Sequence, residues 1–235
     1  MTTNETRLTS VPMAIIARIH TDFPAKFGVP RQSGLIDALE AEIVFEKEYR
    51  RPEAFRGLEN YSHLWLLWHF SEAARADWSP TVRPPRLGGN RRMGVVATRS
   101  PFRPNAIGLS AVRLLGVEQT ADRGPVLRVA GADLMDGTPI FDVKPYLPYA
   151  DAHADATGGF TDEVAFQSLK VDCPAELFAL VPEAKREALL RVLASDPRPH
   201  YQSDAERLYG FGFAGMEVKF TVADGTLTVR RVEQA

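Results

Sequence analysis

The stretch Leu109-Ser-Ala-Val-Arg-Leu-Leu-Gly-Val117, with the downstream run Pro125-Val-Leu-Arg-Val-Ala-Gly131, is the part of the chain that decides the fold. Both runs are short and rich in apolar and β-branched residues. The segment between them has the Asp and Gly content of a turn. The stretch therefore predicts consecutive β-strands.

Further strand-like runs lie upstream and are separated by Pro, Gly and Asn. They are Met13–Ile19, Ala41–Phe45, Gly94–Thr98 and the continuous apolar run Leu64–Phe70, which is typical of a strand buried on both faces or of a buried helix. One helix is expected after Pro52, over Glu53–Leu58. Many short strands without alternating long helices indicate a β-barrel or a β-sandwich rather than a doubly wound sheet.

A composition change at residues 151–159, toward Asp, Ala, His, Thr and Gly, indicates a linker, and we place a domain boundary between residues 1–158 and 159–235. The second region has helical spacing over Ala175–Val181 and over 182–194, with Pro182 in the first turn of the second helix. Two β-branched runs then flank Asp224-Gly225, a strong hairpin signal. The sequence thus predicts a mainly β protein with a small C-terminal α+β domain.

The segment from Val82 to Ser110 has an unusual charge pattern. It contains six arginines and no acid, in a chain of 235 residues whose net charge is −2. Arginine recognises phosphates and carboxylates in a bidentate manner, so the segment indicates an anionic partner. A solvated turn with charged edges is the alternative for the glycine-containing part, Arg86–Arg92.

Two other polar segments are candidates for a site. The proline-flanked loop Phe23–Leu35 either presents Arg31 and Gln32 to a ligand or is an ordinary connection. Asp133 and Asp142 alternate with apolar residues and are candidate pocket carboxylates, whereas Asp136, before Gly137, is typical of a turn cap.

Several classes of protein are disfavoured. The single cysteine excludes a disulfide framework, and the five histidines lack the spacing of metal ligands, so no metal is expected. No Gly-x-Gly-x-x-Gly motif follows a predicted strand, which leaves a Rossmann nucleotide site unsupported. The polar start of the chain and the absence of a long apolar run predict a cytoplasmic protein without a membrane anchor.

Taken together, these segments resemble the TsaA-like family. The matching motifs, in the family's order, are Lys26-Phe-Gly-Val-Pro-Arg-Gln32, Ser62-His-Leu-Trp65, Val82-Arg-Pro-Pro-Arg-Leu-Gly-Gly-Asn90, Gly94-Val-Val-Ala-Thr-Arg-Ser100, Arg103-Pro-Asn-Ala-Ile-Gly-Leu-Ser110, Ala132-Asp-Leu-Met-Asp-Gly-Thr-Pro139, Lys144-Pro-Tyr-Leu-Pro-Tyr-Ala-Asp151 and Asp196-Pro-Arg-Pro-His-Tyr201. The resemblance covers nearly the whole chain.

The resemblance implies a fold and an activity. Family members have a small N-terminal β-barrel, unlike the Rossmann methyltransferases, and form homodimers. They use S-adenosylmethionine to methylate N6 of N6-threonylcarbamoyladenosine at position 37, in the anticodon loop of threonine tRNA. On this basis residues 1–158 form the cofactor-binding barrel, and residues 159–235 anchor tRNA or support the dimer.

The family's cofactor contacts carry over to matching positions of this chain. They fall on Arg31, Gln32, Ser33, Ser71, Glu72, Arg99, Leu109, Gly131, Ala132, Asp133 and Leu134. One position departs from the family pattern, since Ser71 stands where a histidine is usual and His69 lies two residues earlier. A side-chain contact from that histidine would be lost here, whereas a backbone contact would be kept.

Methyl transfer to a carbamoylated nitrogen requires loss of the nitrogen's proton, so we expect a general base within hydrogen-bond reach. The candidates are Asp133, Asp142 and Tyr146, and the sequence leaves their order open. Candidate tRNA contacts are Arg83, Arg86, Asn90, Arg91, Arg92, Arg103 and Lys144.

Two alternatives to this tRNA methyltransferase activity remain at this point. One is a non-catalytic RNA-binding module whose cofactor pocket has decayed, as Ser71 would allow, and the other is an S-adenosylmethionine-dependent methyltransferase that acts on another nucleoside or a small molecule.

Overall fold

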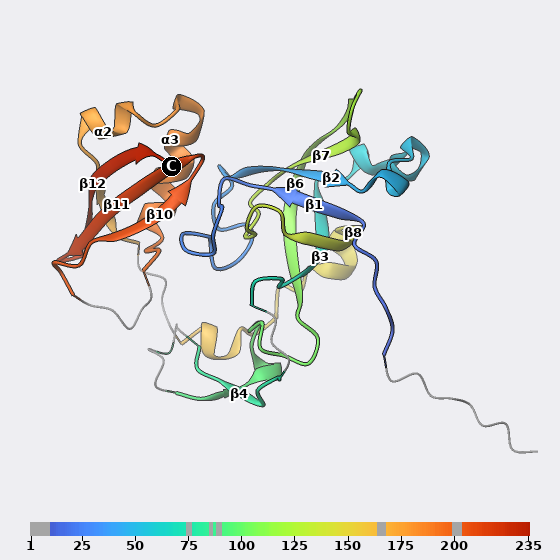
Figure 1. Ribbon diagram of the computed structural model, residues 1–235. Helices are drawn as coiled ribbons and strands as arrows, with labels where there is room; N and C mark the ends of the chain where they lie inside the picture. Colours follow the sequence, from blue (N-terminus) through green and yellow to red (C-terminus); the bar gives the residue numbers. More distant parts are fainter. Residues whose placement is uncertain (1–9, 74–76, 85–86, 88–90, 164–167, 199–203) are drawn as a thin grey trace, which may run out of the picture.

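In the computed structural model of the protein, the residues described here are 10–73, 77–84, 87, 91–163, 168–198 and 204–235. Two of the residues predicted to contact tRNA, Arg86 and Asn90, lie outside these ranges. A closed barrel, a neighbouring α+β region and a short two-stranded ribbon make up the described structure (Figure 1).

Six antiparallel strands close the barrel in the order β1-β2-β7-β6-β3-β8. Their bounds are β1 (Ala17–His20), β2 (Glu40–Phe45), β3 (His63–His69), β6 (Ile107–Thr120), β7 (Gly124–Ala130) and β8 (Pro139–Pro145). The small β-barrel expected from the family resemblance is therefore confirmed, and the sandwich alternative is excluded.

The interior of the barrel is filled by alternate side chains of its strands. On β3, Leu64, Leu66 and Trp68 are buried, whereas the residues between them are partly exposed. The run 64–70 is thus a strand rather than a helix, and only one of its faces is fully buried. Its outer face carries Trp65, whose ring packs on Tyr146 at 5.4 Å between centroids.

Some predicted elements differ from those observed. The first strand is shorter, since β1 begins at Ala17, and the helix predicted over 53–58 is a pair of 3-10 helices, Pro52–Phe55 and Leu58–Asn60. The run Gly94–Thr98 is mostly a 3-10 helix, Val95–Ala97, because its pairing with a neighbouring strand stops at Gly94. β8 was not predicted, since Asp142 and Lys144 interrupt its apolar pattern.

The C-terminal region has the predicted α+β character. A four-stranded sheet, in the order β10-β11-β12-β9, packs against two helices. The bounds are β9 (Lys170–Asp172), α2 (Ala175–Ala179), α3 (Glu183–Ala194), β10 (Tyr209–Phe213), β11 (Met216–Ala223) and β12 (Thr226–Gln234). The hairpin at Asp224-Gly225 is confirmed, and Pro182 caps α3 rather than lying in its first turn.

β10 was not predicted, because Gly210 and Gly212 give it the composition of a loop. These glycines and Gly215 happen to have the spacing of a dinucleotide-binding motif. They lie in the β10–β11 hairpin instead of between a strand and a helix, so they form no phosphate-binding turn.

The loop between β1 and β2 belongs to the core of the C-terminal region. Phe23, Ile36 and Leu39 are buried in the same cluster as the apolar residues of α3 and β10–β12. The rings of Phe23 and Phe213 lie 5.4 Å apart, and the Lys185 ammonium contacts the Asp22 carboxylate at 2.7 Å. The loop that carries Arg31 and Gln32 is therefore part of the core of the C-terminal region, which is separate from the core inside the barrel.

The described residues 77–84, 87 and 91–106, between β3 and β6, form an arm that carries most of the arginine-rich segment. β4 (Thr81–Val82) pairs with β5 (Met93–Gly94), and Figure 1 shows this ribbon below the barrel. The helix α1 (Pro148–Asp151) and a 3-10 helix at Gly159–Thr161 lie between β8 and the C-terminal region in the chain. Among the described residues, no helix has the length and apolarity needed to cross a membrane.

The packing of the β1–β2 loop against the C-terminal core can be tested at Gly28. This residue has φ of +95°, and a Cβ there would overlap the ring of Phe211. We expect Gly28→Ala to lower the free energy of unfolding by about 2–4 kcal/mol, because backbone strain adds to steric overlap. Urea unfolding measures this loss.

Gly215→Ala is the matched control. Gly215 also has positive φ, +76°, but open space around the position of a Cβ, so only the backbone cost of about 1 kcal/mol is expected. Equal losses for the two variants would contradict the packing of the loop against Phe211.

Candidate functional site

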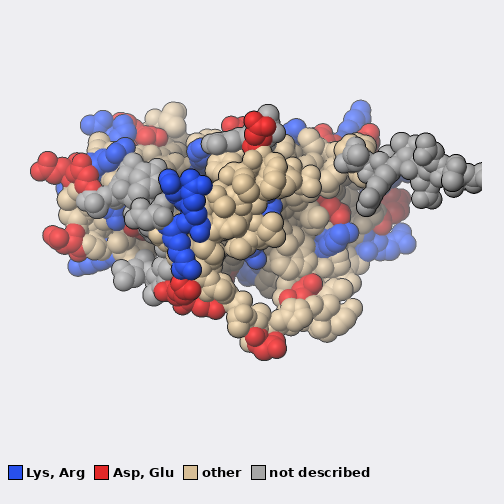
Figure 2. Space-filling view, turned by 90° about the horizontal axis from the view of Figure 1, so that it is seen from below, with Lys and Arg blue, Asp and Glu red and all other residues tan. Residues whose placement is uncertain are grey.

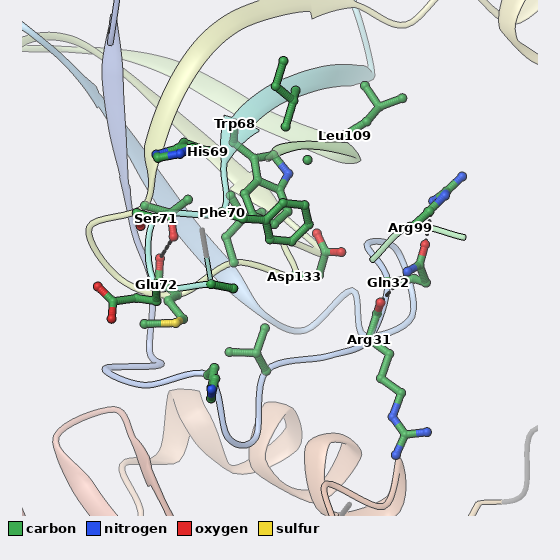
Figure 3. Close-up of a pocket in the computed structure, with 18 of the residues that line it drawn as sticks. Arg31, Gln32, Trp68, His69, Phe70, Ser71, Glu72, Arg99, Leu109 and Asp133 are labelled. Carbon is green, nitrogen blue, oxygen red and sulfur yellow. Dashed lines mark hydrogen bonds between the residues drawn. The ribbon is translucent and has the colours of Figure 1, made fainter. Parts of the chain in front are cut away.

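A cavity of about 650 Å³ opens where the β1–β2 loop, the end of β3, the start of β6 and the segment after β7 meet (Figure 3). Its size is in the range of small-molecule sites. Its lining combines aromatic rings, one carboxylate at depth and several arginines.

Aromatic side chains form an apolar wall of the cavity. The rings of Trp68 and Phe70 lie 4.2 Å apart between centroids, and Trp68 is almost fully buried. Gly108 on β6 lies against the indole, and a Cβ at that position would overlap the ring. Glycine is therefore required at 108 for Trp68 to occupy this place.

Asp133 is the less exposed of the two carboxylates that line the cavity, the other being Glu72. Its Oδ1 accepts a hydrogen bond of 2.6 Å from the Ser110 hydroxyl. Burial raises the pKa of the Asp133 carboxyl above its ordinary value, against the opposing effects of the Ser110 hydrogen bond, backbone amides and the charge of Arg99. A carboxyl with a raised pKa beside a cavity has the properties of a proton acceptor.

The β1–β2 loop is attached to the barrel and to the arm. Gln32 Oε1 accepts from Arg99 Nη1 at 2.5 Å, and Ser33 Oγ accepts from the Ala111 amide at 3.1 Å. The amide of Gly34 donates to the carbonyl of Gly131 at 2.9 Å. Three consecutive loop residues are therefore attached to Arg99, to β6 and to the segment after β7.

Arg31 has a second role besides lining the cavity. Its Nη2 donates to the carbonyls of Asp196 and Arg198, at 3.2 and 3.3 Å. Figure 3 shows its side chain directed away from Asp133 and toward the C-terminal region. The guanidinium thus ties the β1–β2 loop to residues after α3.

Most of the predicted cofactor residues meet at this cavity. Those that line it are Arg31, Gln32, Ser71, Glu72, Arg99, Leu109, Asp133 and Leu134. Ser33, Gly131 and Ala132 are not among its lining residues, and Ser33 and Gly131 act through the loop contacts given above. Ser71 is exposed at the rim, and its amide donates to the His69 carbonyl at 2.8 Å.

The structure separates the three predicted base candidates. Asp142 pairs in register with Leu67 on the outer face of the barrel, and its carboxylate contacts the Lys144 ammonium at 2.8 Å. The Tyr146 amide donates to the carbonyl of His63, at the far end of β3 from the cavity. His63 is five residues, or about 17 Å, from Trp68, which lines the cavity. Of the three, only Asp133 lines the cavity.

Some arginines of the arm line a second, larger cavity of about 1370 Å³. Arg83 and Arg92 line it, and it shares Arg31, Gln32 and Arg99 with the first cavity. Figure 2, seen from the side of the arm, shows a stripe of basic side chains with acidic side chains at one end.

The other predicted tRNA contacts are dispersed. Arg91 pairs with Glu163 at 3.3 Å, and Arg103 lines the first cavity while donating to the Thr98 carbonyl at 3.0 Å. Lys144 lies with Asp142 on the barrel, away from the arm.

Sequence reasoning missed Trp68, Phe70, Gly108 and Ser110. The two aromatic residues lie in an apolar run that predicted only core packing. Of the four, only Ser110 could have been found from the sequence. Its hydroxyl lies between apolar residues of a predicted strand, and a buried hydroxyl needs a polar partner. In the described part of the chain, no group of three or more His, Cys, Asp or Glu side chains could hold a metal ion.

Comparisons with known proteins agree with this architecture. Residues 18–152 match the family model of the tRNA-methyltransferase O N-terminal domain, and residues 164–235 match the TrmO C-terminal domain. A crystal structure of TrmO from Pseudomonas aeruginosa superposes with a TM-score of 0.77 at 32% identity, covering 95% of this chain and 99% of that one.

Two curated relatives are similar over most of their length. The tRNA (adenine(37)-N6)-methyltransferase of Escherichia coli (strain K12) is 41% identical over 226 residues, which cover 93% of this chain and 96% of that protein. A putative S-adenosylmethionine-dependent methyltransferase, RcsF, of Pseudomonas aeruginosa is 41% identical over 210 residues, with coverages of 86% and 89%.

The burial of Asp133 has a consequence for stability. Because the pKa of the carboxyl is raised by folding, the folded state binds its proton more tightly than the unfolded chain, and stability falls as pH rises through that range. We expect Asp133→Asn to raise the melting temperature at pH 8 by about 2–4 °C, equivalent to about 1 kcal/mol. The gain should vanish below about pH 4, where the wild-type carboxyl is protonated in both states.

Asp142→Asn is the control, because the Asp142 carboxylate is 40% exposed and paired with Lys144. It should give no gain at pH 8. A melting temperature of Asp133→Asn that is unchanged or lower at pH 8, measured by calorimetry, would contradict a costly buried carboxylate.

Proposed function

This chain belongs to the tRNA-methyltransferase O family and is an S-adenosylmethionine-dependent methyltransferase of N6 of adenine 37 in tRNA, and we propose that its substrate base is N6-threonylcarbamoyladenosine of threonine tRNA. The observation that carries the function is that both family models match and that the matched residues converge on one cavity beside an arginine-lined one.

The chemistry of the first cavity fits S-adenosylmethionine. This cofactor carries a sulfonium and an ammonium, an anionic carboxylate and an aromatic base. The Asp133 carboxylate and the rings of Trp68 and Phe70 suit the cationic and aromatic groups, and Arg99 suits the carboxylate. Gln32, Leu109 and Leu134 complete the set of residues that would hold it.

When bound, S-adenosylmethionine supplies a methyl group that is already activated, so that its bond to sulfur breaks as the bond to N6 forms. The protein must align the nucleophile and accept the N6 proton. We assign proton acceptance to Asp133, because it is the one base candidate that lines this cavity and its pKa is raised toward the working range. Asp142 and Tyr146 are not part of this assignment.

The second cavity suits the anticodon loop of tRNA. Arg83 and Arg92 would bind backbone phosphates or the threonyl carboxylate there. Arg86, Asn90, Arg91 and Arg103 belong to the same arginine-rich segment as further candidates. Lys144 would reach tRNA only from another part of the surface.

We further propose that the protein acts as a homodimer in the cytoplasm, where tRNA is modified. Leu35 and Leu115 are 46% and 37% exposed, and a second subunit would remove such apolar side chains from water. The C-terminal region would support the cofactor loop through Arg31 in addition to anchoring tRNA or supporting the dimer.

The alternative of a non-catalytic RNA-binding module finds little support. The relatives are named as methyltransferases, and the Ser71 substitution affects the rim of a cavity that keeps Asp133 and its neighbours. The second alternative, a methyltransferase that acts on another nucleoside, is tested by identifying the nucleoside that the protein methylates.

Nucleoside mass spectrometry tests the function. The purified protein is incubated with S-adenosylmethionine and bulk tRNA from cells that lack the corresponding gene. We expect a gain of one methyl group on N6-threonylcarbamoyladenosine, and a loss of at least 100-fold in rate for Asp133→Asn, within the contribution of a general base. Methylation of another nucleoside, or none, would contradict the proposed substrate.

The role of the second cavity is tested with Arg83→Ala/Arg92→Ala. If each arginine binds one phosphate, tRNA affinity should fall and the slope of log K against log salt should decrease by about 1.4–1.8. Fluorescence anisotropy over a range of salt concentrations measures both. The control is Arg123→Ala/Arg128→Ala, whose arginines pair with Glu42 and with Glu40 and Glu118. An equal change in slope for both double variants would contradict a local phosphate site.

A further inference from the structure

A chain of three polar side chains runs from the core of the barrel to the cavity. Trp68 Nε1 donates to Ser110 Oγ at 2.9 Å, and the Ser110 hydroxyl donates to Asp133 Oδ1 at 2.6 Å. We propose that Ser110 is a positioning residue of the reaction, which orients the Asp133 carboxylate through this chain. The inference rests on the proposed function, because it gives Ser110 a role only if Asp133 accepts the N6 proton.

The direction of both hydrogen bonds is fixed by chemistry. An indole nitrogen can only donate, so Trp68 occupies a lone pair of the Ser110 oxygen. The hydroxyl then has its single proton for Asp133, and a distance of 2.6 Å is typical of a hydroxyl bound to a carboxylate. Each bond also polarises the next, which strengthens the contact at the carboxylate.

The Trp68 end of this series of hydrogen bonds is held rigidly by packing. Trp68 is 8% exposed, packs on Phe70 and lies against Gly108, whose lack of a side chain makes room for the ring. Ser110 is 1% exposed and follows Gly108 on the same strand, β6. The Asp133 oxygen that receives the bond is therefore held relative to the barrel rather than to a loop.

Other groups face Asp133 and contribute to its charge state. Backbone amides of Ser33 and of Asp133 itself favour the ionised carboxylate, as does the charge of Arg99. The remaining charged or titratable side chains that line the cavity are Lys26, Arg31, His69, Glu72 and Arg103. Ser110 is distinguished from these groups because it is buried, uncharged and bonded directly to the carboxylate.

Loss of the Ser110 hydroxyl has two separable effects. The hydroxyl stabilises the ionised form of Asp133, so its removal should raise the pKa of the carboxyl further. It also frees the carboxylate to rotate, which lowers the fraction of time in which it can reach the N6 proton.

The test compares Ser110→Ala with Ser110→Thr, which keeps the hydroxyl, and with Trp68→Phe, which keeps the aromatic wall but removes the first donor. Thr120→Ala is the matched control, because it removes a hydroxyl from the same strand that bonds only to the Gly124 carbonyl and the Arg123 amide. The carboxyl carbon of Asp133 is followed by NMR over pH in cofactor-free protein, with Asp133→Asn to assign its signal. The pH dependence of kcat is measured on the same variants.

For Ser110→Ala we expect the Asp133 titration midpoint to move to higher pH, and the acid limb of the kcat profile to move with it. The plateau of kcat should fall about tenfold, while KM for tRNA changes less than twofold. Trp68→Phe should shift both readouts in the same direction by less, and Ser110→Thr should restore them. Thr120→Ala should leave them at the wild-type values.

An unchanged titration midpoint in Ser110→Ala would overturn the proposed role of Ser110, whatever the activity. A shifted midpoint without a shifted acid limb would overturn the assignment of Asp133 as the base, and the role of Ser110 with it. Absence of methylation by the wild-type protein would overturn the proposed function, while the titration would still decide whether the hydrogen bond controls the carboxylate.

Discussion

The packing of the β1–β2 loop between the barrel and the C-terminal region is the constraint on which the site depends. Phe23, Ile36 and Leu39 bury this loop in the C-terminal core, and Arg31 bonds to carbonyls beyond α3. Gln32 is then held beside Arg99, where the two cavities meet. The barrel alone would supply Asp133 and the aromatic wall but would leave one side of the first cavity without support.

The site places the partly buried Asp133 carboxylate between the apolar wall of Trp68 and Phe70 and the arginine-rich arm. Burial works against ionisation of Asp133, whereas Ser110, nearby amides and Arg99 favour it. A carboxylate balanced in this way is costly for folding and useful for taking a proton, as is common where stability and activity conflict. The cationic groups of S-adenosylmethionine would add to the forces that keep it ionised.

The sequence correctly predicts elements that depend on residues close together in the chain. The β-branched runs of β6 and β7 and the hairpin at Asp224-Gly225 follow from periodicity and turn chemistry. Asp142 and Tyr146 could not be separated from Asp133 in this way, because their distance from the cavity depends on strand register. Likewise, Trp68 and Ser110 are far apart in the chain and meet only because β3 pairs with β6.

A crystal structure with bound S-adenosylhomocysteine, the product form of the cofactor, tests the central claim most directly. The account predicts that the ligand occupies the cavity bordered by Gln32, Trp68 and Asp133, with the Ser110–Asp133 hydrogen bond intact. A ligand bound on the outer face of the barrel near Asp142, or beside Tyr146, would contradict it. In that case the assignment of Asp133 as the proton acceptor would fall as well.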